Sequence, residues 1–359
     1  MTGVFDSGVS PDRRHNNFDL LRLLAAWFVL FSHSYPLSGQ PVADPFARNV
    51  GIDTLGGIGV AIFFVLSGYL VTISRERSRT SLEFVRKRAL RIFPALAVVT
   101  ILCVLLLGTS LTTLATEEYL RHPQTRAYFW NIVAWNIHYG LPGVFAGNPA
   151  PNAVNGSLWS LPYEIRCYLI LAILWFLPLP RKVIASVVVL TLAAMLSLRP
   201  LTPPAGVFDK YMGADYYTVK LSLYFCIGAW FAVWRSSVRP PLLLGVCVAA
   251  GAILMSPSQI QTTLFVAGFS VLVLAIGLHP GLLPKLPERM GDWSYGLYLY
   301  GFPVQQVLAL AGLGAAGVAG FTLASTVLAT ICAALSWFLI EKPALTAFKE
   351  RRLSSTLVN

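Results

Sequence analysis

Charged residues are scarce in this sequence. Asp, Glu, Lys and Arg make up 12% of its 359 residues, against roughly 25% in an ordinary soluble domain. Hydrophobic residues reach 56% and fall in runs spread from residue 18 to residue 340. These runs leave no stretch for a separate soluble domain of the usual size. We therefore expect a single all-α integral membrane domain over residues 1–359, with the lipid bilayer around it.

Cysteine and histidine are also scarce, with five of each. The cysteines all lie within predicted membrane spans, where they behave as small apolar side chains. Neither a disulfide framework nor the spacing of metal ligands is present, so we predict no metal site and no tightly bound cofactor. The first seventeen residues are polar, and no small-residue cleavage site follows the first apolar run. We therefore expect this run to be a retained span and not a cleaved signal.

The chain is basic, with a formal net charge of +11. Its Lys and Arg residues fall in short clusters between apolar runs, a pattern that records membrane topology and gives no indication of nucleic-acid binding. With a cytoplasmic N-terminus, 19 of them lie on the inner side and six on the outer side. This bias predicts a multi-pass protein of the inner (cytoplasmic) membrane. Its first segment (1–17) and its tail (341–359) are both expected in the cytoplasm.

Ten apolar runs have a length close to the roughly 17 to 25 residues that cross a bilayer as a helix. The seventh is the weakest because it is short and ends at Met255-Ser256-Pro257. The longest outer connection, residues 110–157, is rich in Trp and Tyr, so we expect part of it at the membrane interface or folded back over the bundle. The predicted spans are 18–38, 57–75, 89–109, 158–178, 182–198, 217–235, 241–255, 261–278, 293–313 and 318–340.

The first span carries Arg22 and His33. Eleven residues of helix make about three turns, so both side chains project from one face, roughly 16 Å apart along the axis. His33 is the only histidine well inside a span, and a near-neutral base in a dry site suits proton transfer. The alternative is a packing histidine bonded to a neighbouring carbonyl. Arg22 is either functional, or an anchor that reaches the membrane surface or pairs with Asp19.

Two further motifs lie in the second and third spans. Ser67 and Gly68 fall in "FFVLSGYL", where small residues allow close helix approach and the hydroxyl can donate a hydrogen bond. Arg88 and Arg91 fall in "RKRALRIFP", three residues apart on one helical face, where two guanidinium groups can clamp a phosphate. Helix packing for the first pair and an ordinary basic anchor for the second are the alternatives.

The fourth and ninth spans add polar groups near their first turns. "NGSLWSLPYEIRCY" contains Trp159 and Glu164, and we expect Glu164 to reach the depth of His33, where a carboxylate can orient a base. An internal ion pair of Glu164 with an arginine is the alternative. "DWSYGLYLYGFPVQQ" offers the polar tips of Tyr295 and Tyr298 on an otherwise apolar helix. The closing "SWFLIEKPA" is interpreted as a stop and an anchor, with Glu341 at the inner surface.

Taken together, these motifs resemble the acyltransferase 3 family of membrane-bound acyltransferases over nearly the whole chain. The resemblance rests on Arg22 and His33 with ten residues between them, "FFVLSG", Arg88 and Arg91 before "IFP", "SLWSLPYE", "SYGLYLY" and "SWFLIEKP". One departure is Gly301, which stands where family members often carry a histidine. We also expect no esterase-like domain of the kind that some members append.

The resemblance implies transfer of an acyl group, acetyl above all, from cytoplasmic acyl-CoA to a hydroxyl of an extracytoplasmic or lipid-linked carbohydrate. It implies His33 and Glu164 as catalytic residues, with His33 as the base. Arg22, Arg88 and Arg91 are then the donor-binding residues. Ser67, Gly68, Trp159, Tyr295 and Tyr298 are expected to line the site.

Two other function classes also place polar residues inside membrane spans. A transporter or flippase for a lipid-linked sugar is the main alternative, although no paired halves with interrupted helices are visible in the sequence. A structural subunit or sensor would tolerate replacement of the charged residues. The sequence carries no signal of the oligomeric state or of which hydroxyl is modified.

Overall fold

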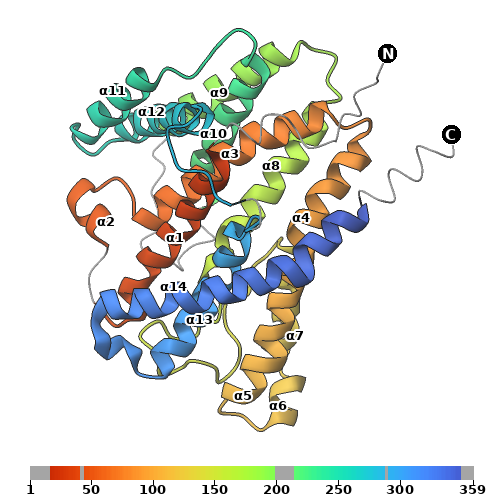
Figure 1. Ribbon diagram of the computed structural model, residues 1–359, viewed down its shortest axis with the longest axis vertical. Coiled ribbons are helices and arrows are strands. Elements are labelled where there is room, and N and C mark those ends of the chain that lie inside the picture. Colours follow the sequence, from red (N-terminus) through yellow and green to blue (C-terminus); the bar gives the residue numbers. More distant parts are fainter. Residues whose placement is uncertain (1–16, 41–43, 199–213, 288–289, 349–359) are drawn as a thin grey trace, which may run out of the picture.

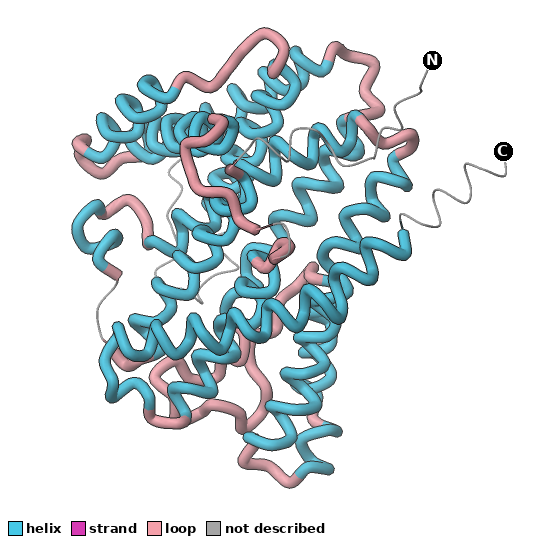
Figure 2. Tube along the Cα trace, in the orientation of Figure 1, coloured by secondary structure: helices cyan, strands magenta, loops and turns pink. Residues whose placement is uncertain are grey.

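The computed structural model describes residues 17–40, 44–198, 214–287 and 290–348, and within these ranges the chain forms helices and loops without a strand (Figures 1 and 2). The long helices are α1 (Phe18–Leu37), α3 (Leu55–Glu76), α4 (Ser81–Leu102), α8 (Leu161–Leu174), α9 (Arg181–Leu198), α10 (Ala214–Trp234), α11 (Leu242–Ile253), α12 (Gln259–Leu278), α13 (Ser294–Leu310) and α14 (Gly317–Ser336). The short α-helices are α2 (Pro45–Val50), α5 (Thr109–Leu111), α6 (Thr116–Arg121) and α7 (Pro123–Tyr128). Single turns of 3₁₀ or π-helix are η2 (Cys103–Gly108), η3 (Phe129–Val133), η4 (Gly156–Ser160), η5 (Leu313–Ala316) and η6 (Trp337–Glu341).

The predicted all-α membrane fold is confirmed. Among the described residues, eight helical stretches are long and apolar enough to cross a bilayer. Two of the predicted spans are shorter, because α11 has 12 residues and α13 has 17. Ten crossings therefore stay a prediction, as does the cytoplasmic side of both termini. Most of residues 1–17 and part of the tail 341–359 lie outside the described residues.

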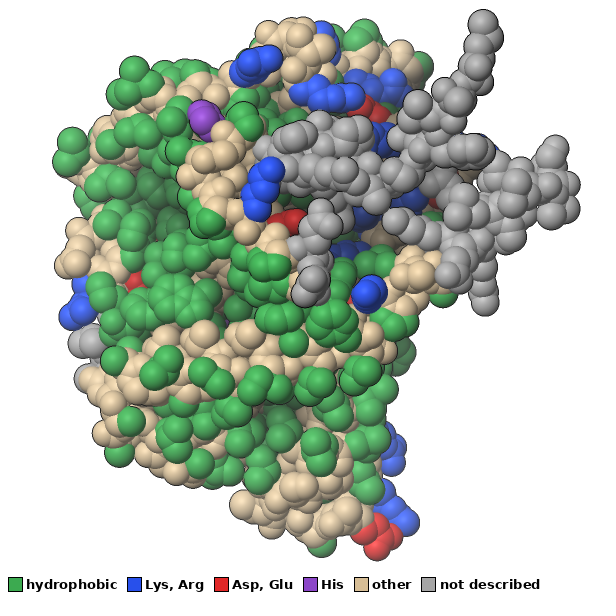
Figure 3. Space-filling view, viewed as in Figure 1, with side chains coloured by type: hydrophobic (Ala, Val, Ile, Leu, Met, Phe, Trp, Pro, Cys, Tyr) green, Lys and Arg blue, Asp and Glu red, His purple; other side chains and the backbone are tan. Residues whose placement is uncertain are grey.

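The outer surface fits a lipid environment. Figure 3 shows a broad hydrophobic face, with Lys and Arg gathered near its upper edge and again at its lower right. The helices α9 and α14 bury little of their surface against the rest of the chain. Their exposed leucine, valine and isoleucine side chains are suited to contact with lipid tails.

α3 lies between α1 and α10 at the centre of the bundle (Figure 1). Two glycines permit this packing. A Cβ added to Gly68 would lie 1.9 Å from the backbone oxygen of Phe225 in α10, and one added to Gly59 would lie 2.4 Å from the backbone oxygen of Ala25 in α1. Small residues of this kind let membrane helices approach closely. Gly68 is thus a packing residue.

The long connection between α4 and α8 folds back into the bundle, as its aromatic content predicted. Pro303 lacks an N–H, so the carbonyl of Leu299, four residues earlier in α13, has no helical partner. Asn155 Nδ2 donates to this carbonyl at 2.9 Å. Gln306 Nε2 donates to the backbone oxygens of Ala150 and Ala153. The segment before α8 is therefore anchored on α13, and α8 begins inside the bundle and not at its outer surface.

Candidate functional site

One pocket opens at the meeting point of α1, α3, α4, α8 and α13. It encloses about 580 Å³, including the part that is open to solvent. Its lining combines basic, acidic and aromatic side chains from helices far apart in the sequence: Arg22, Phe63, Phe64, Arg88, Arg91, Ile92, Ser160, Leu161, Glu164, Tyr168, Ser294, Tyr295 and Tyr298. All three arginines predicted to bind the donor line this pocket.

Two of the arginines are engaged in ion pairs. Arg22 donates to Asp292 at 3.0 Å, and Arg91 donates to the same carboxylate oxygen at 2.6 Å. Arg91 also donates to Glu341 at 2.8 Å. The suggestion that Arg22 pairs with Asp19 is thus replaced by a pair across the bundle with Asp292, and Arg91 is an internal group and not a surface anchor.

The third arginine is different. Arg88 makes no hydrogen bond and no ion pair with any residue that the structure describes, and its Nε is buried without a partner. As predicted, Arg88 and Arg91 face the same way from α4, since both line the pocket. The pocket therefore contains one guanidinium group that no carboxylate neutralises directly.

Glu164 occupies this pocket and does not contact His33. Its Oε1 accepts hydrogen bonds from Ser67 Oγ at 3.1 Å and from Tyr168 Oη. Ser67 therefore holds the carboxylate, although it is not itself in the pocket lining. In the part of the chain that the structure describes, no hydrogen bond joins Glu164 to His33.

The expectation that Glu164 reaches the depth of His33 is therefore corrected. α3 runs antiparallel to α1, because Gly56 lies against Ser32 whereas the ring of Tyr69 lies 5.7 Å from that of Phe18. Ser67, the partner of Glu164, is thus level with the beginning of α1. The reason is the fold-back of the connection before α8, which lowers the start of that helix into the bundle.

His33 lies about three turns away along α1. Its ring meets the ring of Phe302 in α13 edge to face, with centroids 5.2 Å apart. Its Nδ1 is buried and has no hydrogen-bond partner, and no carbonyl of the described chain accepts a bond from the imidazole. The contacts thus give no support to a packing histidine bonded to a carbonyl.

The two tyrosines predicted in α13 both line the pocket. Tyr295 Oη donates to the backbone oxygen of Ile92 at 3.0 Å. Tyr298 Oη lies 2.8 Å from Ser160 Oγ and donates to the backbone oxygen of Ser157. Both hydroxyl groups thereby tie α13 to neighbouring segments.

Trp159 and Gly68 are not in the pocket lining. The ring of Trp159 packs against Tyr163 and Tyr217, with centroids 6.1 and 5.0 Å apart. Gly68 faces α10. Of the five predicted lining residues, the structure therefore places Tyr295 and Tyr298 in the lining, Ser67 behind Glu164, and Trp159 and Gly68 in helix packing.

Three residues of the site were missed or misread in the sequence. Asp292 and Tyr168 were not singled out, although both stand inside the quoted motifs. Glu341 was interpreted as a surface anchor, and this is wrong, because its side chain is 2% exposed and bonded to Arg91. An acidic residue at the end of an apolar run was the available signal, since such a group is rarely buried without a cation.

Comparisons with known proteins show which family the chain belongs to. The chain matches the acyltransferase 3 family profile, which is described as an acyltransferase domain, over residues 15–340. It is 32% identical to an O-acetyl transferase of Shigella phage Sf6, over 93% of this chain and 97% of that protein. It is 32% identical to nodulation protein 10 of Rhizobium leguminosarum bv. viciae, over 96% and 100% of the two chains. It is 28% identical to the exopolysaccharide production protein ExoZ of Rhizobium meliloti (strain 1021), over 85% and 94%. No solved structure matches.

Proposed function

Since this chain belongs to the acyltransferase 3 family and is a membrane O-acyltransferase, we propose that its donor is acyl-CoA, acetyl-CoA above all. We propose a carbohydrate hydroxyl as its acceptor, either outside the cytoplasm or on a lipid carrier. The observation that carries the proposal is the arginine pocket at the beginning of α1, on the same helix as His33. The name of one relative, an exopolysaccharide production protein, supports a polysaccharide acceptor.

The donor's phosphates are proposed to bind in the pocket that Arg22, Arg88 and Arg91 line. Guanidinium groups suit phosphate oxygens because their N–H groups form a planar fork. The predicted inner side of the first turns of α1 is the cytoplasmic side, where acyl-CoA is present. We therefore propose the inner membrane as the location of the enzyme.

The acyl arm is proposed to run from the pocket along α13 toward His33. Ala26 and Val29, which lie between Arg22 and His33 on α1, are buried in helix packing. Tyr298 and Phe302, in contrast, are four residues apart on one face of α13. Tyr298 lines the pocket and Phe302 contacts His33. We propose that the acyl arm follows this face over roughly 16 Å, the rise of α1 between Arg22 and His33.

His33 is proposed as the general base. Its imidazole takes the proton of the acceptor hydroxyl while the hydroxyl oxygen attacks the thioester carbonyl carbon. The carbon–sulfur bond then breaks, the ester remains on the sugar, and the proton passes from the imidazole to the CoA thiolate. The unbonded Nδ1 of His33 supports this role, since no other residue of the described chain occupies it.

Glu164 retains a proposed catalytic role, but at the donor end of the site. Its carboxylate is held by Ser67 and Tyr168 in the pocket that contains the three arginines. We propose that it orients the donor there and does not orient His33. The sequence-based suggestion of a His33–Glu164 pair is not carried further.

The experiment that tests the function uses protein reconstituted in liposomes. Acetyl-CoA with a labelled acetyl group is supplied on one side, and surface polysaccharide from the producing cells on the other. We expect label in alkali-labile esters of the polysaccharide. Movement of unmodified polysaccharide or lipid-linked sugar without ester formation would instead support the transporter alternative, which no comparison favours.

A further inference from the structure

Arg91 is held from several directions. Its guanidinium bonds the carboxylates of Asp292 and Glu341 at 2.6 and 2.8 Å. The rings of Tyr295 and Trp337 lie 5.5 and 5.9 Å from its central carbon, within reach of a cation–π attraction. A guanidinium group with two carboxylates and two rings has little freedom to turn toward a ligand.

Glu341 is directed at Arg91 by an irregular part of the last helix. It ends the π-helical turn η6, and Ser336 Oγ donates to its second carboxylate oxygen at 3.1 Å. π-Helical turns inside α-helices are rare and occur often at functional sites. The π-helical turn thus changes the face of the helix on which Glu341 lies, and directs its side chain inward to Arg91.

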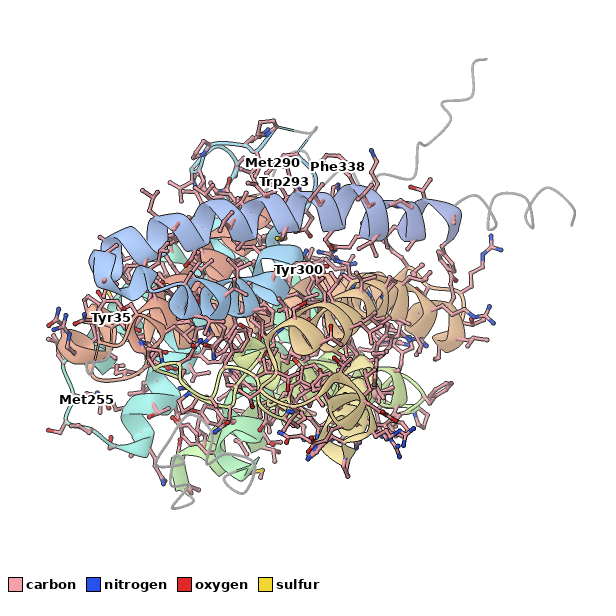
Figure 4. The ribbon with its side chains drawn as sticks, turned by 90° about the horizontal axis from the view of Figure 1, so that it is seen from below. Tyr35, Met255, Met290, Trp293, Tyr300 and Phe338 are labelled. Carbon is pink, nitrogen blue, oxygen red and sulfur yellow. The ribbon has the colours of Figure 1, made fainter. Side chains whose placement is uncertain are left out.

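Asp292 is fixed from the other side, immediately before α13. One carboxylate oxygen accepts from Ser294 Oγ and from the Ser294 backbone N–H, and the other accepts from Arg22 and Arg91. A Cβ added to the preceding Gly291 would lie 2.0 Å from Trp337 Nε1, so this segment is pressed against η6. Figure 4 shows Met290, Trp293 and Phe338 together on the same side of α14.

Arg88 has none of these restraints. It lines the same pocket, has no hydrogen bond or ion pair with a described residue, and keeps its Nε buried without a partner. Glu164, the other carboxylate of the pocket, bonds Ser67 and Tyr168 instead. A half-buried cation without a directly bonded partner carries a desolvation cost, so a site of this kind favours occupation by an anion.

We propose that the three arginines have different tasks: Arg88 contacts a phosphate of the donor directly, whereas Asp292 and Glu341 are positioning residues that neutralise Arg22 and Arg91 and hold them at the pocket wall. This division of tasks rests on the proposed function, since it assumes a phosphate-bearing thioester as ligand. The contacts support it, because Arg22 and Arg91 are bonded directly to Asp292 and Glu341, whereas Arg88 has no directly bonded carboxylate among the described residues and Glu164 bonds Ser67 and Tyr168.

The test measures the dissociation constant of acetyl-CoA for purified protein in lipid nanodiscs, at low and at high salt. In Arg88→Gln we expect binding to weaken about tenfold or more, since a charge-assisted contact is lost. We also expect its salt dependence to flatten, because salt screens charge contacts. Arg88→Lys, which keeps the charge but not the fork, should recover part of the affinity. Arg86→Gln, an exposed arginine on the same helix, is the matched control and should bind like the wild type.

The decisive variant is the double replacement Arg91→Gln with Glu341→Gln. It removes a cation and an anion together, so the pocket keeps its net charge, and Asp292 keeps Arg22 as its partner. We expect the dissociation constant to change by less than about threefold and the salt dependence to stay as in the wild type. If the double variant binds as weakly as Arg88→Gln, Arg91 contacts the donor itself and the proposed division of tasks is wrong.

A third result concerns the function and not the division of tasks. If the wild-type protein binds no acetyl-CoA while it remains folded and monodisperse, the proposed donor is wrong, and the present inference fails with it. If the wild type binds acetyl-CoA but the double variant binds it as weakly as Arg88→Gln, the proposed division of tasks is wrong and the proposed donor stands. The two failures are therefore distinguishable in one set of measurements.

Discussion

The two ends of α1 have opposite surroundings. Around Arg22, three arginines and Glu164 line the pocket. The carboxylates of Asp292 and Glu341 form ion pairs with Arg22 and Arg91. Around His33 the nearest ring is the apolar Phe302, and no ion pair or hydrogen bond of the described chain reaches the imidazole. A charged end suits recognition of a charged carrier, and an apolar end with an unbonded imidazole nitrogen suits proton transfer. We therefore assign donor binding to the end around Arg22 and the acyl transfer step to the end around His33.

The largest effect is expected at the apolar end. His33→Ala should lower acyl transfer by about a hundredfold or more, because general bases contribute roughly 10²- to 10⁴-fold. The rate of transfer to the polysaccharide at saturating acetyl-CoA measures this. His138→Ala, in a loop where only the backbone of His138 is bonded, is the control and should keep the normal rate. A folded His33→Ala protein with a normal rate of transfer would show that His33 is not the general base.

At the charged end, Glu341→Ala should affect stability most. Removal of this buried carboxylate leaves Arg91 with Asp292 alone, and loss of one partner of a buried pair costs about 3 kcal/mol. Chemical unfolding in detergent measures the change. The double variant Arg91→Gln with Glu341→Gln should be more stable than Glu341→Ala, since it leaves no unpaired charge. Equal stability of the two would show that the pair is not the source of the effect.

Gly68 and Gly301 differ in how closely they are packed. Gly68→Ala should cost about 1 to 3 kcal/mol of stability, because its Cβ would meet a backbone oxygen that cannot move aside without shifting α10. Gly301→Ala, whose Cβ would lie 3.5 Å from Leu30, makes only an ordinary contact and should be close to neutral. Thermal unfolding of both variants compares them directly. If Gly68→Ala is as stable as the wild type, α3 and α10 are less closely fixed than the structure indicates.

The smallest effect is expected for Tyr168→Phe, which removes one of the two hydrogen bonds to Glu164. A bond to a charged group contributes about 1.5 kcal/mol or somewhat more, so transfer should fall roughly tenfold, with His33 untouched. Tyr163→Phe on the same helix removes a hydroxyl group that makes no hydrogen bond with a described residue, and serves as the control. Equal rates for the two variants would show that the position of the Glu164 carboxylate does not matter.

The sequence predicted the convergence of the arginines correctly. Arg22, Arg88 and Arg91 lie at similar distances from the inner ends of their spans, so a helix period and a topology were enough to bring them together. The all-α membrane fold followed from composition alone. These predictions succeed because the bilayer fixes both the direction and the depth of each helix.

The carboxylate partners could not be predicted in the same way. Asp292 meets Arg22 and Arg91 only after a loop is pressed against α14, and Glu341 turns inward through a π-helical turn. The depth of Glu164 was wrong for a related reason, since the fold-back before α8 depends on Asn155 bonding a carbonyl that Pro303 leaves open. Such contacts between distant segments leave no periodic signal in the sequence.

The most direct test of the central claim compares acetyl-CoA binding by Arg88→Gln and His33→Gln under identical conditions. We expect Arg88→Gln to raise the dissociation constant about tenfold or more, and His33→Gln to leave it within about twofold of the wild type and to abolish transfer. A His33→Gln protein that loses donor affinity as strongly as Arg88→Gln would contradict the separation of donor binding and chemistry between the two ends of α1.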